Sequence, residues 1–143
     1  LEREHIEVLS GGRLRQTPGK WNSLGLIKFN LPNPYDVYLH DTPARELFNA
    51  HMRAFSHGCM RVENAVDLAA WLLRDRPEWP RDRIMAESQR GIQQFIAVRA
   101  PLATHVLYWT AFVDDAGELH FAPDVYARDG ALDAAMRVRP SSH

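Results

Sequence analysis

Two short segments of alternating side chains, separated by Pro32-Asn33-Pro34, restrict the fold of this chain more than any other feature. Residues 26–31 alternate with the two-residue period of a strand. The prolines favour a turn, and residues 35–40 then read as a second strand. On that strand Asp36, Tyr38 and His40 share the face opposite Val37 and Leu39. The pattern predicts a β-sheet with His40 at the C-terminal end of one strand.

The rest of the chain alternates short helical and strand-like segments. Thr42 can cap a helix over 43–50, Asn64 can cap a second helix that ends before Pro77, and a third helix is expected near 82–94. Residues 51–61 show no period and are predicted to form a loop that leads into the second helix. Further strands are expected over 95–98, 104–113 and 118–121, the last two joined as a hairpin through 114–117. The chain is therefore predicted to be mostly β within the α+β class, with an antiparallel core and short helical insertions.

Charge and cysteine content limit the classes of partner and the kinds of site that this chain can have. The 143 residues suffice for one domain, and a formal net charge of −1 gives no electrostatic reason to expect nucleic acid or an anionic membrane as a partner. No apolar run is long enough to span a bilayer. The single cysteine, Cys59, excludes an internal disulfide and a cysteine-rich zinc cluster.

Cys59 has neighbours that suit a nucleophile. A cysteine reacts as its thiolate, which a nearby histidine favours, and both His57 and His40 are candidates. Gly58 permits close backbone approach, and the backbone N–H groups of Gly58 and Cys59 can serve as oxyanion donors. Arg61 adds a positive charge suited to a substrate carboxylate. Two alternatives remain open at this point. One is a buried structural cysteine, and the other is a metal site built from His40, His51, His57 and Cys59.

Two longer segments carry a family resemblance. Tyr38-Leu39-His40-Asp41-Thr42-Pro43 and Arg53-Ala54-Phe55-Ser56-His57-Gly58-Cys59-Met60-Arg61-Val62-Glu63-Asn64 resemble the signature of the L,D-transpeptidase (YkuD-type) catalytic domain. Gln16-Thr17-Pro18-Gly19, Asn22-Ser23-Leu24-Gly25, Lys28-Phe29 and Leu31-Pro32-Asn33 resemble the stretch before the signature, and Thr110-Ala111-Phe112-Val113 resembles the closing hairpin. The resemblance covers roughly residues 13–129 and is closest to the large Gram-negative, YcbB-like branch.

The resemblance implies a mechanism and assigns roles. It implies an antiparallel β-sandwich core and acyl transfer from a tetrapeptide stem of peptidoglycan, through a thioester on Cys59, to the amine of a neighbouring stem. His40 would be the base, with one ring nitrogen oriented by a backbone carbonyl near Asp41, and His57 would support the oxyanion loop. Residues expected to line the oxyanion or substrate site are Gly58, Tyr38, Ser56, Arg61, Arg53 and Asp41. No metal or cofactor is expected, the location would be the periplasm, and carbapenem β-lactams would be covalent inhibitors.

The resemblance also sets expectations for organisation. Residues 1–12 would end an upstream or capping segment, 13–130 would form the catalytic domain, and 131–143 would be a C-terminal tail. The first strands of the family fold would be absent from this chain. Two other functions stay open. A hydrolase could use Cys59 with water as acceptor, or the chain could be a non-catalytic wall-binding module that keeps the fold. Separately, Arg53 and Arg61 could form structural ion pairs with Glu63 or Asp67 in place of contacts with substrate.

Overall fold

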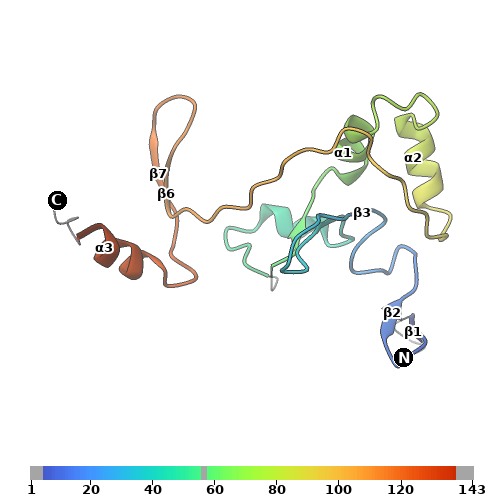
Figure 1. Cartoon of the computed structure of the whole chain (residues 1–143), viewed down its shortest axis with the longest axis horizontal. Helices are drawn as coiled ribbons and strands as arrows, with labels where there is room; N and C mark the ends of the chain where they lie inside the picture. The colour runs from blue at the N-terminus through green and yellow to red at the C-terminus, as the bar shows by residue number, and fades with distance from the viewer. Residues whose placement is uncertain (1–4, 56–57, 138–143) are drawn as a thin grey trace. The chain divides into compact units, whose positions relative to one another are not determined.

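A computed structural model of the chain describes residues 5–55 and 58–137 and divides it into two compact units, Leu1–Ala103 and Thr104–His143. Short strands and helices follow one another along the chain (Figure 1). In order they are β1 (Ile6–Val8), β2 (Leu14–Gln16), β3 (Lys28–Phe29), β4 (Leu39–His40), the 3₁₀ helix η2 (Arg45–Asn49), β5 (Met60–Arg61), α1 (Ala65–Leu72), α2 (Arg81–Ser88), β6 (Ala111–Val113), β7 (Leu119–Phe121) and α3 (Asp129–Arg137). The predicted α+β class is confirmed.

The three-stranded sheet β3-β4-β5 organises the first unit. Strands β3 and β4 pair antiparallel, with Lys28 opposite His40, so both strands predicted over 26–40 are confirmed in shortened form. Strand β5 then pairs parallel with β4, placing Arg61 opposite His40. The prediction of a loop over 51–61 is therefore wrong for its last two residues, Met60 and Arg61, which form β5. A parallel pairing needs a long crossover connection, and the chain between His40 and Met60 supplies one.

Helices α1 and α2 pack against each other in the same unit and enclose its small core. Ala69, Leu73 and Ile84 are buried, and partly buried side chains surround them, including those of Phe29, Trp79, Ile96 and Val98. Helix α1 begins after Asn64 as predicted, although the Asn64 side chain makes no capping hydrogen bond. Helix α2 ends at Ser88 and not near residue 94, because Gly91 adopts a φ of 70° that no α-helix contains. Residues 95–98, predicted as a strand, contribute to this core without strand pairing.

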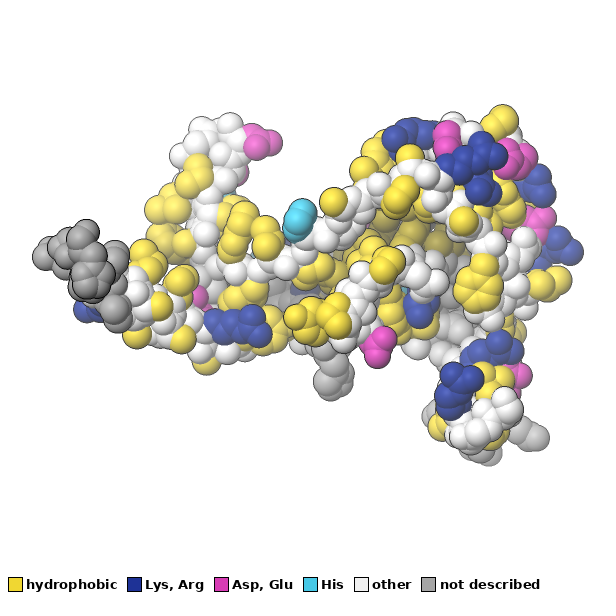
Figure 2. Space-filling model, in the orientation of Figure 1, with side chains coloured by type: hydrophobic (Ala, Val, Ile, Leu, Met, Phe, Trp, Pro, Cys, Tyr) yellow, Lys and Arg dark blue, Asp and Glu magenta, His cyan; other side chains and the backbone are white. Residues whose placement is uncertain are grey.

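The second unit contains the hairpin β6–β7 and helix α3. Ala111 pairs with Phe121 and Val113 with Leu119, which confirms the predicted hairpin, although its first strand begins at residue 111 and not at 104. Helix α3 occupies residues expected to be a tail, and the Arg137–Asp133 ion pair one turn apart supports it. Hydrophobic side chains remain on the surface of this unit, Trp109 being 64% exposed (Figure 2). Trp109 is therefore not the sheet-core residue that its apolar neighbours suggest.

Two further points concern the chain as a whole. None of the helices among residues 5–55 and 58–137 has the length and apolar character needed to cross a membrane. The domain boundaries predicted at residues 12 and 130 stay predictions.

Candidate active site

Strand β5 brings the single cysteine beside the strand that carries His40. The Met60 N–H donates to the Tyr38 carbonyl oxygen at 3.1 Å, and the Val62 N–H donates to the His40 carbonyl oxygen at 2.8 Å. Cys59 immediately precedes this paired segment. Two backbone hydrogen bonds thus hold residues that are about twenty positions apart in one fixed register.

The Cys59 thiol contacts the segment that precedes β4. Its Sγ is 3.9 Å from the Asp36 carbonyl oxygen, within the range of a weak thiol hydrogen bond. Burial, together with a hydrogen bond to Cys59 and the charge of that group, raises the pKa of the Tyr38 hydroxyl above its ordinary value of 10.0. Tyr38 is therefore a neutral O–H at physiological pH. Such a hydroxyl can donate to a sulfur that carries negative charge.

His40 is buried and oriented by the backbone. The residue is 5% exposed, and Nδ1 of its ring lies 2.5 Å from the Asp41 carbonyl oxygen, the kind of contact expected for a histidine base. A carbonyl oxygen can only accept, so Nδ1 carries a proton in this contact, and Nε2 is the ring nitrogen left to act as the base. The Tyr38 ring packs edge-on against the His40 ring with 5.9 Å between centroids. Tyr38 thus contacts both the thiol and the imidazole.

Asp41 anchors this strand end through its side chain. Its carboxylate accepts the Leu26 N–H at 2.9 Å and forms an ion pair with Arg45 at 2.9 Å, while the residue itself is 4% exposed. Gly25 has a φ of 64°, and a Cβ there would meet the Asp41 backbone at 2.6 Å. The contribution of Asp41 to the site is thus its carbonyl oxygen, because its carboxylate is already occupied by structural partners.

Gly58 adopts a conformation that favours glycine. Its φ is 145°, and an added Cβ would lie 3.3 Å from a methyl group of Val37. Ser56 and His57, the other predicted members of this loop, lie outside the described residues. The structure therefore gives the backbone path that leads out of Gly58 into Cys59, and the oxyanion role of the loop stays a prediction.

Within the part of the chain that the structure describes, Arg53 and Arg61 take no part in structural ion pairs. Neither forms a salt bridge with any residue in the described ranges, and Asp67 pairs instead with Arg81 at 2.5 Å. The alternative that assigned them to Glu63 or Asp67 is wrong. Arg61 lies opposite His40 in the sheet and is half-buried, whereas Arg53 is exposed.

The metal alternative finds no support in the described part of the chain. His40, His51 and Cys59 do not form a cluster of donor atoms, and His57, the fourth residue of that alternative, lies outside the described residues. The one such group among residues 5–55 and 58–137 is Asp114, Glu118 and His120. That group lies in the second unit, where Asp114 and His120 form an ion pair across the hairpin.

Asp36 and Lys28 are the site residues that reasoning from the sequence did not select. The Lys28 ammonium lies 3.8 Å from the centroid of the Tyr38 ring, and the Asp36 carbonyl contacts the thiol. A signal for Asp36 was present, since the alternation places it on the same face as Tyr38 and His40. No comparable signal marks Lys28, because its proximity to Tyr38 depends on the β3–β4 pairing.

Comparisons with known proteins bear on this arrangement. A family model for the YkuD L,D-transpeptidase catalytic domain matches residues 2–89. The chain is also similar to a protein of Haemophilus influenzae named "Putative L,D-transpeptidase", with 35% identity over 137 residues, 94% of this chain. The chain spans 27% of the length of that relative. The matched residues include Tyr38, His40 and Cys59.

Proposed function

Because the chain belongs to the L,D-transpeptidase catalytic domain family, we propose that it forms 3→3 cross-links between peptidoglycan stem peptides. The observation that carries this proposal is the convergence on one sheet of the Cys59 thiol, the Tyr38 hydroxyl and the oriented His40 imidazole. A nucleophile, an O–H donor and a base are the groups that acyl transfer requires. The domain works without a metal or organic cofactor.

The first half-reaction acylates Cys59. Its thiolate attacks the carbonyl carbon at the L-centre of the diamino acid in a tetrapeptide stem, and a C–S bond forms. The C–N bond to the terminal D-alanine breaks, and that amine leaves with the proton that His40 Nε2 took from the thiol. Tyr38 stabilises the negative charge on sulfur before attack. The loop that contains Ser56, His57 and Gly58 stabilises the charge that develops on the carbonyl oxygen.

The second half-reaction resolves the thioester. The neutral side-chain amine of a neighbouring stem attacks the acyl carbon, a C–N bond forms and the C–S bond breaks. The amine gives up one proton to His40 Nε2, and Cys59 leaves as its thiolate. Over the two steps one amide bond replaces another, and one D-alanine is released. The substrate is part of the cell wall, so the domain acts in the periplasm.

Acyl-enzyme formation on Cys59 tests the function. The intact protein is incubated with a tetrapeptide stem in the absence of acceptor, and its mass is measured. The expected gain equals the stem minus D-alanine, and peptide mapping assigns it to Cys59. Addition of an acceptor stem then separates the two outcomes of resolution. A cross-linked dimer supports transpeptidation, whereas a free tripeptide as the sole product supports a hydrolase.

A further inference from the structure

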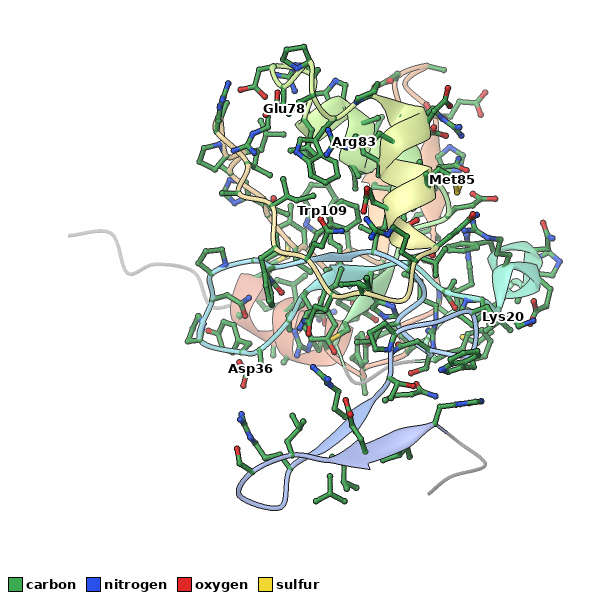
Figure 3. The ribbon with its side chains drawn as sticks, turned by 90° about the vertical axis from the view of Figure 1, so that its right-hand side faces the viewer. Lys20, Asp36, Glu78, Arg83, Met85 and Trp109 are labelled. Atoms are coloured by element: carbon green, nitrogen blue, oxygen red, sulfur yellow. The ribbon has the colours of Figure 1, made fainter. Side chains whose placement is uncertain are left out.

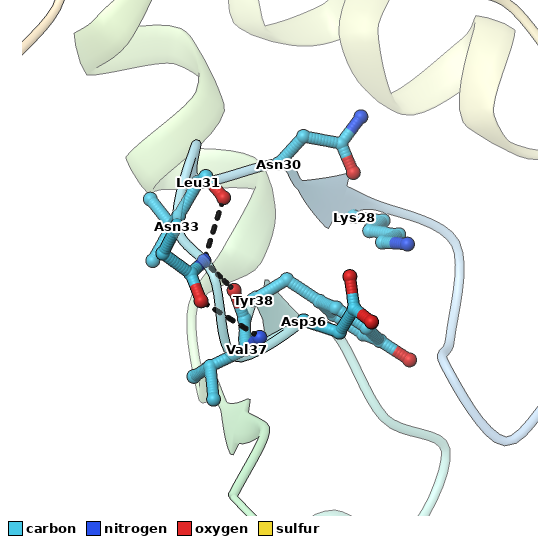
Figure 4. A pocket seen from close by; sticks show the side chains of 7 residues that line it. All are labelled: Lys28, Asn30, Leu31, Asn33, Asp36, Val37 and Tyr38. Carbon is cyan, nitrogen blue, oxygen red and sulfur yellow. Dashed lines mark hydrogen bonds between the residues drawn. The ribbon is translucent and has the colours of Figure 1, made fainter.

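A cavity lies beside the residues that contact the thiol. Its volume is about 330 Å³, and Figure 4 shows the side chains that line it. They come from β3, from the turn after it and from the segment before β4, and comprise Lys28, Asn30, Leu31, Asn33, Asp36, Val37 and Tyr38. Two of these residues, Tyr38 and Asp36, also contact Cys59. A molecule in the cavity therefore lies next to any group bound to the sulfur.

The cavity carries one charge of each sign. Lys28 and Asp36 are both exposed, and neither forms a salt bridge with a described residue. The Lys28 ammonium instead lies over the Tyr38 ring at 3.8 Å. A free anion would meet Asp36 and a free cation would meet Lys28, so a ligand with a single charge is opposed by one of the two. A ligand with both charges on adjacent groups satisfies each of them.

The wall that carries Asp36 is held in place by Asn33. The Asn33 amide donates to the Leu31 and Val37 carbonyl oxygens at 2.7 Å each, and its oxygen accepts the N–H groups of Tyr35 and Val37 at 3.0 and 3.2 Å. Asp36 itself has a φ of 52°, a conformation that costs free energy for a residue other than glycine. This conformation places its carbonyl against the thiol and its carboxylate at the cavity.

We propose that this cavity binds the acceptor, with Lys28 holding the carboxylate and Asp36 holding the ammonium of one zwitterionic carbon centre. The proposal rests on the function proposed above. In a stem whose third residue is a diamino diacid, the acceptor side chain ends in one carbon bearing both an amine and a carboxylate. Of the two charged residues, Asp36 is the one whose backbone carbonyl contacts Cys59, so we orient the amine end of the acceptor toward the thioester. The bound ammonium loses one proton to water, and its nitrogen then attacks as described.

A two-stage assay tests the proposal in the intact protein. The acyl-enzyme is formed with a tetrapeptide donor, excess donor is removed, and its decay is followed by intact mass with D-methionine or D-methionine amide as acceptor. The amide keeps the amine and lacks the carboxylate. We compare the rate of acyl-enzyme decay with D-methionine to the rate with D-methionine amide. Lys28→Met should lower this ratio about tenfold, because the acid acceptor loses one favourable charge contact and the amide does not. Lys28→Arg keeps the charge and should keep the ratio.

Asp36→Asn tests the other half of the site. Asparagine tolerates the same positive φ, so this change removes the charge and leaves the backbone in place. We expect the acceptor concentration for half-maximal decay to rise about tenfold for both the acid and the amide. The rate of acylation by the donor is measured separately for this variant, so that an effect on the donor step is not mistaken for an effect on the acceptor. Lys20→Met is the matched control for Lys28, since Lys20 is the other lysine of the chain and lies well apart from Asp36 (Figure 3). Asp115→Asn is the control for Asp36.

Three results would overturn the proposal. An equal effect of Lys28→Met on acid and amide acceptors would show that no carboxylate binds there. A donor carries a carboxylate as well, so acylation is compared for a tetrapeptide and its terminal amide. If Lys28→Met slows acylation by the free acid alone, Lys28 belongs to the donor site. Failure of the unaltered protein to form any acyl-enzyme would overturn the proposed function itself, and is seen at the first stage before any acceptor is added.

Discussion

The Nδ1 atom of His40 lies 2.5 Å from the carbonyl oxygen of Asp41, the next residue in the chain. This contact fixes which ring nitrogen is protonated, because the carbonyl has no proton to donate. The Asp41 carboxylate is in turn held by the Leu26 N–H and the Arg45 guanidinium. The orientation of the proposed base thus depends on a residue whose carboxylate binds Leu26 and Arg45 while its backbone carbonyl binds the imidazole.

The His40→Asn variant tests the role of Nε2 separately from that of Nδ1. The asparagine amide N–H approximates Nδ1 and can still donate to the Asp41 carbonyl, whereas nothing replaces Nε2. We expect the rate of acylation to fall by about 10²–10⁴-fold, the usual contribution of a general base, with little loss of thermal stability. His57→Ala should cost less. A larger loss for His57→Ala than for His40→Asn, measured by single-turnover release of D-alanine, would reverse the assignment of the base.

Carbapenems test the nucleophile without a peptidoglycan substrate. The Cys59 sulfur attacks the strained lactam carbonyl, the ring C–N bond opens, and no group leaves. The protein should therefore gain the full mass of the carbapenem, and peptide mapping should place it on Cys59. Penicillins are expected to react poorly by comparison. Cys59→Ala should show neither adduct nor cross-linking while its circular dichroism is unchanged, and an adduct in that variant would contradict the assigned nucleophile.

The Gly25→Ala variant should disturb the position of Asp41, whose carboxylate binds the Leu26 N–H and Arg45. The positive φ of 64° costs about 1–2 kcal/mol for any residue with a side chain, and a Cβ at 2.6 Å from the Asp41 backbone adds a steric term. Gly11→Ala is the matched control, because Gly11 has a φ of 80° with nothing within 4 Å of the added Cβ. Chemical denaturation should show a larger loss of stability for Gly25→Ala. Equal losses would mean that the approach to Asp41 relaxes without cost.

The hairpin of the second unit should weaken in acid. The hydrogen bond from His120, together with backbone N–H groups, lowers the pKa of Asp114 below its ordinary value of 3.8. A lowered folded pKa stabilises the hairpin above pH 3.8, and that stabilisation is lost as the pH falls through the folded value. Amide chemical shifts of β6 and β7 should report this transition. Asp114→Asn should abolish it, whereas a transition that persists in Asp114→Asn would assign it to another group.

Local patterns along the chain were sufficient for much of the fold. The alternation over 26–40 predicts β3 and β4, the apolar stripe predicts α1, and the turn at 114–117 predicts the hairpin. Strand lengths were overestimated, since residues 104–110 have the composition of a strand but β6 begins only at Ala111. Helix α3 was not predicted, although its alanines and an Arg137–Asp133 pair favour it.

The sequence by itself determined the family, the reactive residue types and the face on which Tyr38 and His40 stand. These properties follow from residue identity and from a two-residue period, both of which are local. Tertiary structure alone decided the parallel pairing of β5 with β4, which brings Cys59 to Tyr38 and Asp36. It also decided that Lys28 lies over the Tyr38 ring and that Lys28 and Asp36 line one cavity. Those contacts join segments far apart in the chain, and pairing partners at that distance are chosen by hydrogen bonding and packing of the whole unit.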